Sequence, residues 1–228
     1  MRIDREVEEK YLNALKNNPD FKVKGGKFYA FMKRTIDIVA SLLAILLLSW
    51  LFIILAILVK VTSKGPIIYK SIRYAEKGKY FNMYKFRSMY KDADEGKAAL
   101  MAQNEVEGGV TFKMKNDPRI TPLGKFLRKT SLDELPQLFN ILFGNMSICG
   151  PRAGLKNEIM KYDDRAILRL SVKQGLTGEW QTHGRSTTTF ETMIDMDLAY
   201  ITKKRGFWYD IKLMFLTVWC IITGNGAE

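Results

Sequence analysis

Residues 38–59 read IVASLLAILLLSWLFIILAILV, and this uncharged run decides which kinds of fold the chain can adopt. A helix needs about 20 consecutive apolar residues to cross the hydrocarbon core of a membrane, so the run is long enough for a single transmembrane helix. Two features favour instead a re-entrant helix, which enters the membrane and returns to the same face. Trp50 lies near the middle of the run, although tryptophan prefers the membrane–water interface. The flanks are also basic on both sides, whereas a span should have positive charge mainly on one side. The basic flanking residues are Lys33 and Arg34 before the run and Lys60, Lys64, Lys70 and Arg73 after it.

The composition of the 228-residue chain points to anionic partners. Its formal charge is +12 and its pI is about 9.6, which suits nucleic acid, phosphorylated small molecules or anionic lipid headgroups. Cys149 and Cys220 do not make a disulfide framework, so we expect a reducing compartment. His183 is the only histidine, which excludes a multi-histidine zinc site. Any metal would be a hard cation on carboxylates and phosphate, and Mg²⁺ is favoured.

The periodicity of the chain predicts a mostly helical α+β protein with a small β-hairpin. Residues 1–27 contain a short helical pattern, and residues 67–69 and 80–86 resemble strands joined by a turn over 73–79. Residues 91–107 and the chain from Leu123 onward are predicted to be helical, with a loop at Gly108-Gly109. The last apolar run, residues 211–222, is too short to span a membrane. It fits an amphipathic helix in the membrane interface or a buried core helix, and both alternatives stay open.

Thr130-Ser131-Leu132-Asp133-Glu134-Leu135-Pro136-Gln137-Leu138 places two adjacent carboxylates in an apolar, proline-containing stretch. Ser131 and Glu134 have the spacing of a capping box, which would make both acids ordinary residues of a first helical turn. A helix that starts at Asp133 instead puts Pro136 in the first turn, where no N–H is needed. Asp133 would then lie at the positive end of a helix, where phosphate also binds.

Several further residues suit phosphate binding, although each one alone is more readily explained as structural. Lys85 and Arg87 point to one face if the chain stays extended there, and they could clamp a phosphate. Arg152 follows Gly150-Pro151 on a rigid turn, which suits bidentate contact with phosphate. The remaining candidates lie in a glycine loop or in helical stretches: Arg185, Asp197 and Asp210. Together with the apolar run they indicate phosphate chemistry at a membrane surface.

These ordered motifs resemble the bacterial sugar transferases, a family of monotopic polyprenol-phosphate phosphoglycosyl transferases. The resemblance runs from Lys33 to Glu228, and its final part resembles the hexose-phosphate branch that starts exopolysaccharide or O-antigen synthesis. The motifs that carry it are Lys33-Arg34-Thr35-Ile36-Asp37, Gly65-Pro66, Lys85-Phe86-Arg87-Ser88-Met89, Asp117-Pro118-Arg119-Ile120-Thr121, the stretch from Thr130 to Leu138, Gly150-Pro151-Arg152, Gly175-Leu176-Thr177-Gly178, Gly184-Arg185 and Asp197-Leu198-Ala199-Tyr200.

The resemblance implies an enzyme that moves a sugar-1-phosphate from a UDP-sugar to undecaprenyl phosphate and releases UMP. Galactose or glucose is the expected sugar. Asp133 would be the nucleophile that forms a phosphosugar–aspartyl intermediate, and Asp133 and Glu134 would hold Mg²⁺. The other residues that match family positions around the substrate are Lys85, Arg87, Arg152, Arg185, Asp197 and Asp210.

The same resemblance implies a place in the cell and a set of partners. It predicts a polar N-terminal extension over residues 1–32, a membrane-inserted helix over 33–62 and a catalytic domain over 63–228. That domain would lie on the cytoplasmic face of the bacterial inner membrane, in contact with membrane lipids. Downstream glycosyltransferases and a second copy of the chain are further candidate partners, and nucleic acid is not expected.

The sequence departs from the family pattern at two positions. Ser49 is followed by Trp50 where the family usually has proline, so the easiest cause of a bend is missing, although Ser49 could bend the helix by bonding back to a carbonyl. Ala153 follows Arg152 where proline is usual, which should loosen that turn. The chain also lacks the extra membrane region of long family members, so we expect a short form or a catalytic part.

Two other functions compete with transfer. A membrane-anchored basic module could bind anionic lipid or nucleic acid without catalysis, and its binding would fall steeply with salt. A phosphohydrolase could use the same carboxylates with water as the acceptor, which would release free sugar phosphate.

Overall fold

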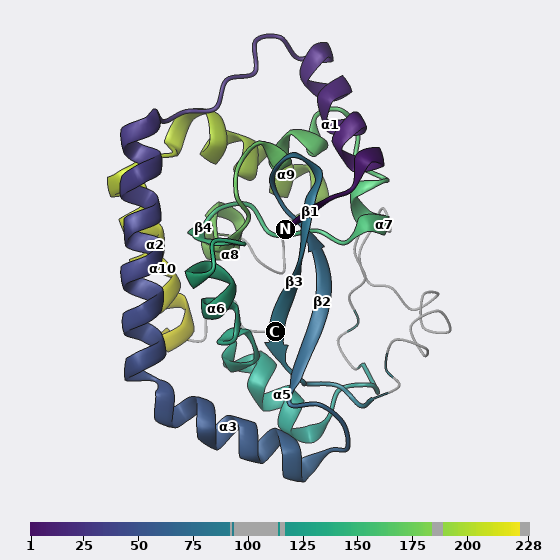
Figure 1. Cartoon of the computed structure of the whole chain (residues 1–228), viewed down its shortest axis with the longest axis vertical. Coiled ribbons are helices and arrows are strands. Elements are labelled where there is room, and N and C mark those ends of the chain that lie inside the picture. The colour runs from purple at the N-terminus through teal and green to yellow at the C-terminus, as the bar shows by residue number, and fades with distance from the viewer. Residues whose placement is uncertain (92, 94–113, 115–116, 184–188, 224–228) are drawn as a thin grey trace.

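The computed structural model describes residues 1–91, 93, 114, 117–183 and 189–223. The predicted helix over 91–107 lies almost entirely outside these residues, as do Gly108-Gly109 and Arg185. The described chain is mostly helical with two small sheets, which agrees with an α+β fold (Figure 1). Its elements are β1 (Arg2–Ile3), α1 (Arg5–Asn17), α2 (Lys27–Leu47), α3 (Ser49–Thr62), β2 (Ile68–Tyr74), the 3-10 turn η1 (Glu76–Gly78), β3 (Lys79–Phe86), α5 (Pro122–Lys129), the 3-10 turn η3 (Leu132–Glu134), α6 (Gln137–Leu142), β4 (Ser147–Cys149), α7 (Lys156–Ile159), the 3-10 segment η4 (Ala166–Ser171), β5 (Gly175–Thr177), α8 (Glu179–His183), α9 (Phe190–Ala199), the π-helical η5 (Tyr200–Lys204) and α10 (Phe207–Thr223).

The predicted hairpin is present as the antiparallel pair β2 and β3, which occupies the centre of the molecule (Figure 1). Its first strand runs to Tyr74, beyond the predicted residues 67–69, so the turn is shorter than the predicted 73–79. Ile68 pairs with Phe86 and Tyr74 pairs with Tyr80. The two-residue strand β1, which the sequence did not reveal, adds to the free edge of β3. The hairpin therefore places its last β3 residues next to α3, α6 and η3.

The N-terminal helix α1 is part of the folded core. Val7, Tyr11 and Ala14 are buried on one face of α1 and pack with Ile167 and Leu170 of η4. This confirms the helical pattern seen in residues 1–27. It also shows that the segment packs on the domain.

The uncharged run forms two helices that meet at a sharp bend. α2 and α3 are separated by Leu48 and are bent by 65° relative to one another (Figure 1). Within the described residues no single helix combines the length and hydropathy of a membrane span, whereas this bent pair does so by length and composition. Leu48 adopts φ −98° and ψ 8°, so the helix is interrupted one residue before Ser49 without a proline.

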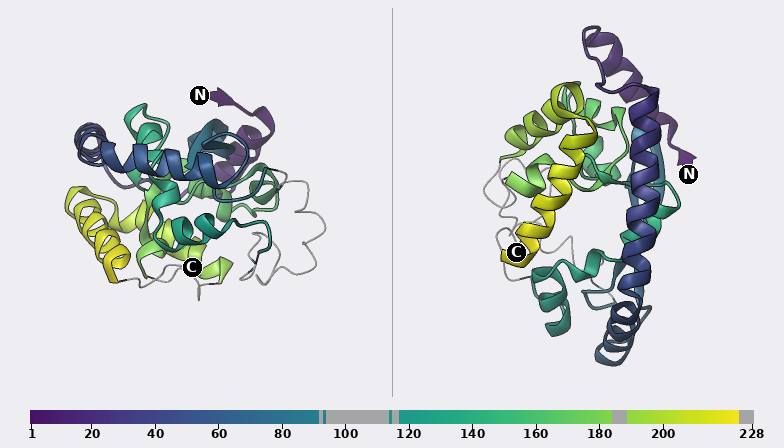
Figure 2. Two further views of the ribbon diagram at one scale, coloured as in Figure 1. Left: turned by 90° about the horizontal axis from the view of Figure 1, so that it is seen from below. Right: turned by 90° about the vertical axis from the view of Figure 1, so that its left-hand side faces the viewer.

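Much of the apolar surface of these helices is exposed. Leu47 is 72% exposed, Trp50 60% and Ile53 62%, all close to the bend. α10 runs along the same side of the molecule as α2 (Figure 2) and exposes Phe215, Trp219 and Ile222. The end of α10 thus presents an apolar face outward, as the interfacial alternative for residues 211–222 expects.

Candidate active site

The acidic pair Asp133-Glu134 lies in the 3-10 turn η3, between helices α5 and α6. We predicted that a helix starts at Asp133, and this was wrong: α6 begins at Gln137, directly after Pro136. Ser131 has a positive φ of 56°, which ends the preceding helix, and Pro136 flanks the first helical residue, where its missing N–H costs nothing. The carboxylate of Asp133 is therefore held by a turn and does not lie at a helix N-terminus.

Lys85 of β3 contacts both carboxylates of the pair. Its Nζ lies 2.6 Å from Glu134 Oε1 and 4.0 Å from Asp133 Oδ2. Asp133 is buried, while Glu134 is partly exposed. The ammonium group thus partly neutralises two adjacent negative charges that would otherwise repel one another and any phosphate.

An amide side chain fixes the position of β3 relative to α6. Asn140 is fully buried; its Oδ1 accepts a 2.9 Å hydrogen bond from the N–H of Tyr84, and its Nδ2 donates 2.8 Å to the carbonyl of Asn82. These bonds connect the helix that follows the acidic pair to the strand that carries Lys85. Asn140 is therefore a positioning residue for the contact between Lys85 and the two carboxylates.

The environment of Asp133 opposes its ionisation. Burial raises the pKa of the Asp133 carboxyl, and nearby Glu134 raises it further, although Lys85 and Arg128 act in the opposite direction. The raised pKa reflects the poor solvation of this carboxyl beside a second acid.

The turn that carries Arg152 is built by close backbone packing. β4 and β5 pair in parallel, the N–H of Gly175 donates 2.8 Å to the carbonyl of Pro151, and a Cβ on Gly175 would lie 2.2 Å from the nitrogen of Gly150. The two glycine motifs of the sequence therefore form one structure. Arg152 extends from it and lies 6.0 Å above the ring of Trp180. Arg152, Lys85 and Glu134 line the same small cavity, together with Arg73, Gln137 and Gln181.

Arg87 lies elsewhere, at the end of α3. Its Nη2 donates to the carbonyl of Val59 at 3.1 Å and to the carbonyl of Ser63 at 2.5 Å, and its Nη1 donates to the carbonyl of Pro66. The buried guanidinium thus satisfies carbonyls that the end of a helix leaves without partners. Lys85 and Arg87 were predicted to share one face, but they contact different elements.

Asp197 is buried in an ion pair with Arg169. Nη2 and Nε of Arg169 lie 2.6 Å and 2.7 Å from Asp197 Oδ2, and Nη1 donates 3.1 Å to the hydroxyl of Tyr162. Both charged side chains are almost completely inaccessible. This arrangement is that of an internal structural pair, and the predicted substrate contact for Asp197 stays a prediction.

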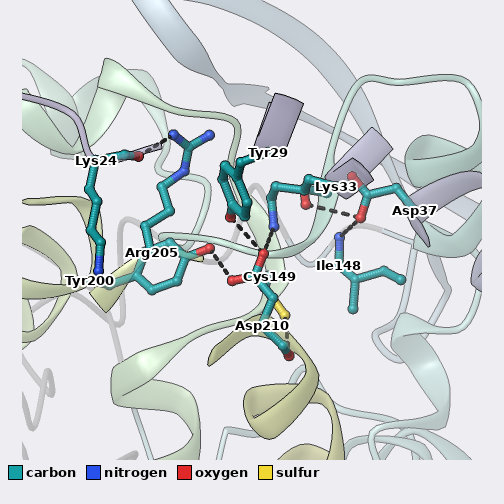
Figure 3. Close-up of polar contacts among 10 residues, drawn as sticks. Lys24, Tyr29, Lys33, Asp37, Ile148, Cys149, Tyr200, Arg205 and Asp210 are labelled. Atoms are coloured by element: carbon teal, nitrogen blue, oxygen red, sulfur yellow. Dashed lines mark hydrogen bonds and ion pairs between the residues drawn. The ribbon is translucent and has the colours of Figure 1, made fainter. Parts of the chain in front are cut away.

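Asp210 of α10 is the centre of a second buried polar cluster (Figure 3). Its Oδ2 lies 2.6 Å from Nζ of Lys33 on α2 and accepts a 2.7 Å hydrogen bond from the hydroxyl of Tyr29. Its Oδ1 accepts a 2.7 Å hydrogen bond from the hydroxyl of Tyr200. The predicted substrate contact for Asp210 likewise stays a prediction, because the described contacts of its carboxylate are all internal.

The acidic pair fits a magnesium ion whose remaining ligands would come from the phosphates of a substrate and from water. Mg²⁺ in phosphoryl-transfer sites usually takes one or two carboxylates and completes its shell with phosphates and water. Asp133 and Glu134 are adjacent hard oxygen donors, and the part of the chain that the structure describes has no group of three or more acidic, histidine or cysteine side chains that could hold a metal ion. These two carboxylates would hold such an ion only together with an anionic ligand.

The family model for the bacterial sugar transferases matches residues 28–224 of this chain. The chain belongs to this family. A galactosyl transferase of Streptococcus agalactiae is 40% identical over 89% of this chain and 45% of its own length. An undecaprenyl-phosphate galactose phosphotransferase of Salmonella typhimurium is 43% identical over 86% of this chain and 42% of its own length. An exopolysaccharide production protein of Rhizobium meliloti is 37% identical over 86% of this chain and 87% of its own length. The chain thus spans less than half of the length of the first two relatives.

In this family member the structure brings together only part of the predicted site. Glu134, Lys85 and Arg152 line one cavity, and Asp133 lies 4.0 Å from Lys85, while Arg87, Asp197 and Asp210 make the internal contacts described above. Sequence reasoning missed Asn140 and Arg73. A polar residue within the apolar stretch after Pro136 could have revealed Asn140, whereas Arg73 was noted only as a flanking charge.

Proposed function

We propose that this chain transfers a sugar-1-phosphate, with galactose or glucose as the sugar, from a UDP-sugar to undecaprenyl phosphate. The observation that carries the proposal is the buried Asp133 carboxylate beside Glu134 and Lys85. The names of the relatives from Streptococcus agalactiae and Salmonella typhimurium support galactose, and a Klebsiella pneumoniae relative named for glucose-1-phosphate transfer is 43% identical over 82% of this chain.

The proposed reaction has two displacements at one phosphorus atom. An oxygen of Asp133 attacks the β-phosphorus of the UDP-sugar, and the bond to the bridging oxygen breaks, so UMP leaves with the electron pair. A phosphate oxygen of undecaprenyl phosphate then attacks the same phosphorus and displaces the Asp133 carboxylate. Lys85 and Arg152 offset the charge of the phosphates during both steps. Mg²⁺ on Asp133 and Glu134 would supply further positive charge beside the diphosphate.

The proposed location is the cytoplasmic face of the bacterial inner membrane. A lipid acceptor needs a site at the membrane surface, and the bent pair α2–α3 exposes apolar side chains on both sides of its bend. Leu46, Leu47, Trp50 and Ile53 would enter the bilayer as a re-entrant segment, and the apolar face of α10 would lie in the interface. Cysteines placed at residues 28 and 64 in a background without Cys149 and Cys220 should both be labelled from the cytoplasm; labelling from opposite sides would show a true span.

The activity is tested by UMP release from a panel of UDP-sugars with undecaprenyl phosphate and Mg²⁺. Asp133→Asn should abolish release, and the wild type with donor alone should carry a phosphosugar adduct on Asp133 in a mass spectrum. Asp20→Asn, the same change at an exposed carboxylate, is the matched control and should keep full activity. Full activity of Asp133→Asn would refute the mechanism. Free sugar phosphate as the product would identify a hydrolase, and lipid binding without UMP release would identify a non-catalytic module.

A further inference from the structure

Two arginines from distant parts of the chain line the cavity beside the acidic pair. Arg73 lies near the end of β2, and Arg152 lies on the turn after β4. Nη1 of Arg73 donates a 3.1 Å hydrogen bond to the carbonyl of Ala153, the residue directly after Arg152. Arg73 is therefore tied to the backbone of the turn that carries Arg152.

The charges around this cavity are unbalanced. Lys85 is already paired with Glu134 and lies near Asp133. Nε of Arg73 is buried and makes no hydrogen bond within the described residues. Burial lowers the pKa of Arg73 and the charge of Arg152 lowers it further, while Glu158, Tyr69 and Glu134 act in the opposite direction. Arg73 is partly buried and Arg152 is exposed, and an anion in the cavity that both line would lie next to two cations.

We propose that Arg73 is a substrate-binding residue that holds the diphosphate of the nucleotide sugar together with Arg152. A guanidinium presents several N–H donors in a fixed plane, which matches the oxygens of a phosphate. A diphosphate offers two such groups, and it would neutralise both arginines while its β-phosphorus faces Asp133. The inference rests on the proposed function, because it assigns the ligand of the same site.

Arg73 has a second effect, on the turn itself. The carbonyl that it holds belongs to Ala153, the position where the family usually has proline. The hydrogen bond restrains a turn that alanine alone would leave looser. If Arg73 had only a structural role, it would act through this hydrogen bond alone. A test must therefore separate loss of the Arg73 charge from loss of the N–H donor to Ala153.

Arg73→Gln provides that separation, because glutamine keeps an N–H donor for Ala153 and removes the charge. We expect the KM for the UDP-sugar to rise about tenfold to a hundredfold, the usual cost of losing hydrogen bonds to a charged group. The KM for undecaprenyl phosphate should not change, since UMP leaves before the acceptor reacts. Arg73→Lys keeps a charge without the planar donor set and should lie between the wild type and Arg73→Gln.

The matched control is Lys70→Gln, which removes a charge from an exposed position of the same strand. It should leave both KM values unchanged. A wild-type KM for the UDP-sugar in Arg73→Gln, or an equal rise in Lys70→Gln, would overturn the proposal. Should Arg73→Gln fail to fold, a wild-type KM in Arg73→Lys would overturn it as well, because that variant cannot make the planar contact.

Binding of inorganic pyrophosphate by calorimetry distinguishes failure of this inference from failure of the proposed function. Pyrophosphate should bind the wild type and Lys70→Gln equally, and Arg73→Gln at least tenfold more weakly. If no UDP-sugar is turned over but pyrophosphate binding weakens only in Arg73→Gln, the anion site is supported and the proposed reaction is refuted. If UDP-sugars are turned over and Arg73→Gln binds pyrophosphate like the wild type, the reaction stands and the role of Arg73 does not.

Discussion

Replacing Lys33 with methionine should destabilise the protein strongly, because it leaves the buried carboxylate of Asp210 without its cation. The side chains of Lys33 and Asp210 are 11% and 7% exposed and lie 2.6 Å apart. Removing one partner of a buried ion pair typically costs about 3–5 kcal/mol. For a chain of this size, each kcal/mol lowers the melting temperature by roughly 2–4 °C, so we expect a decrease of about 6–20 °C.

The assay is thermal unfolding of the detergent-solubilised protein, followed by tryptophan fluorescence. Arg165→Met is the matched control, since Arg165 makes its ion pairs with Glu191 and Asp195 on the surface. Such an exposed pair should contribute less than about 1 kcal/mol. A Lys33→Met variant that melts no lower than this control would refute the reasoning.

The double variant Lys33→Met/Asp210→Asn separates the two roles considered for Asp210. The asparagine keeps an oxygen that can accept from a tyrosine hydroxyl of the cluster, and neither charge remains. Its melting temperature should therefore recover most of the loss seen in Lys33→Met. If Asp210 has only this internal role, transfer activity recovers together with stability. A stable but inactive double variant would show instead that the Asp210 carboxylate contacts substrate, as the sequence predicted.

Three further changes test the site and its support. Asp133→Asn should lose transfer activity yet melt no lower than the wild type. A carboxyl whose pKa is raised on folding stabilises the protein only at low pH, and that contribution is lost as the pH rises through the folded-state pKa. A clear decrease in melting temperature at pH 7 would contradict this expectation. For the same reason the rate of adduct formation should fall on acidification at a pH above 3.8, the ordinary value for aspartate, and a rate that stays constant down to that pH would exclude a raised pKa. Arg87→Met should lower the free energy of unfolding by about 1–3 kcal/mol for each carbonyl left without a donor, measured by urea unfolding. Arg87→Lys should recover only part of this loss, since an ammonium cannot reproduce the planar contacts with Val59, Ser63 and Pro66.

The parts of the fold that sequence reasoning predicted correctly depend on local patterns. Alternation and turn residues located the hairpin, and the spacing of Val7 and Tyr11 located α1. The start of the helix after the acidic pair was wrong because it depends on the backbone of Ser131, whose positive φ no residue preference announces. The contact between Lys85 and Glu134 joins residues 49 positions apart, so the spacing of the sequence could not predict it. The contact partners of Arg87 and Asp210 could not be predicted, since a charged residue in the sequence does not indicate which other element its side chain will contact.

The polar residues of α2 change how its basic flank is interpreted. Tyr29, Lys33, Asp37 and Ser41 recur every fourth position of α2, so they form one stripe on the helix. Figure 3 shows the first three of these side chains. Asp37 accepts hydrogen bonds from the hydroxyl of Ser147 and the N–H of Ile148, and it is buried.

Arg34 lies beside this stripe and donates to the carbonyls of Ile141 and Leu142 at the end of α6. Lys33 and Arg34 thus both contact the domain. Because their charges are used in these contacts, they are poor evidence for the side of a membrane on which the helix begins. The proposed re-entrant helix is then supported by the bend at Leu48 and by two cations around the end of α3, Lys60 in its last turn and Lys64 after it. In the proposed arrangement, a helix fixed to the domain along this stripe can place its far end and α3 in the bilayer only if the chain turns back toward the same face.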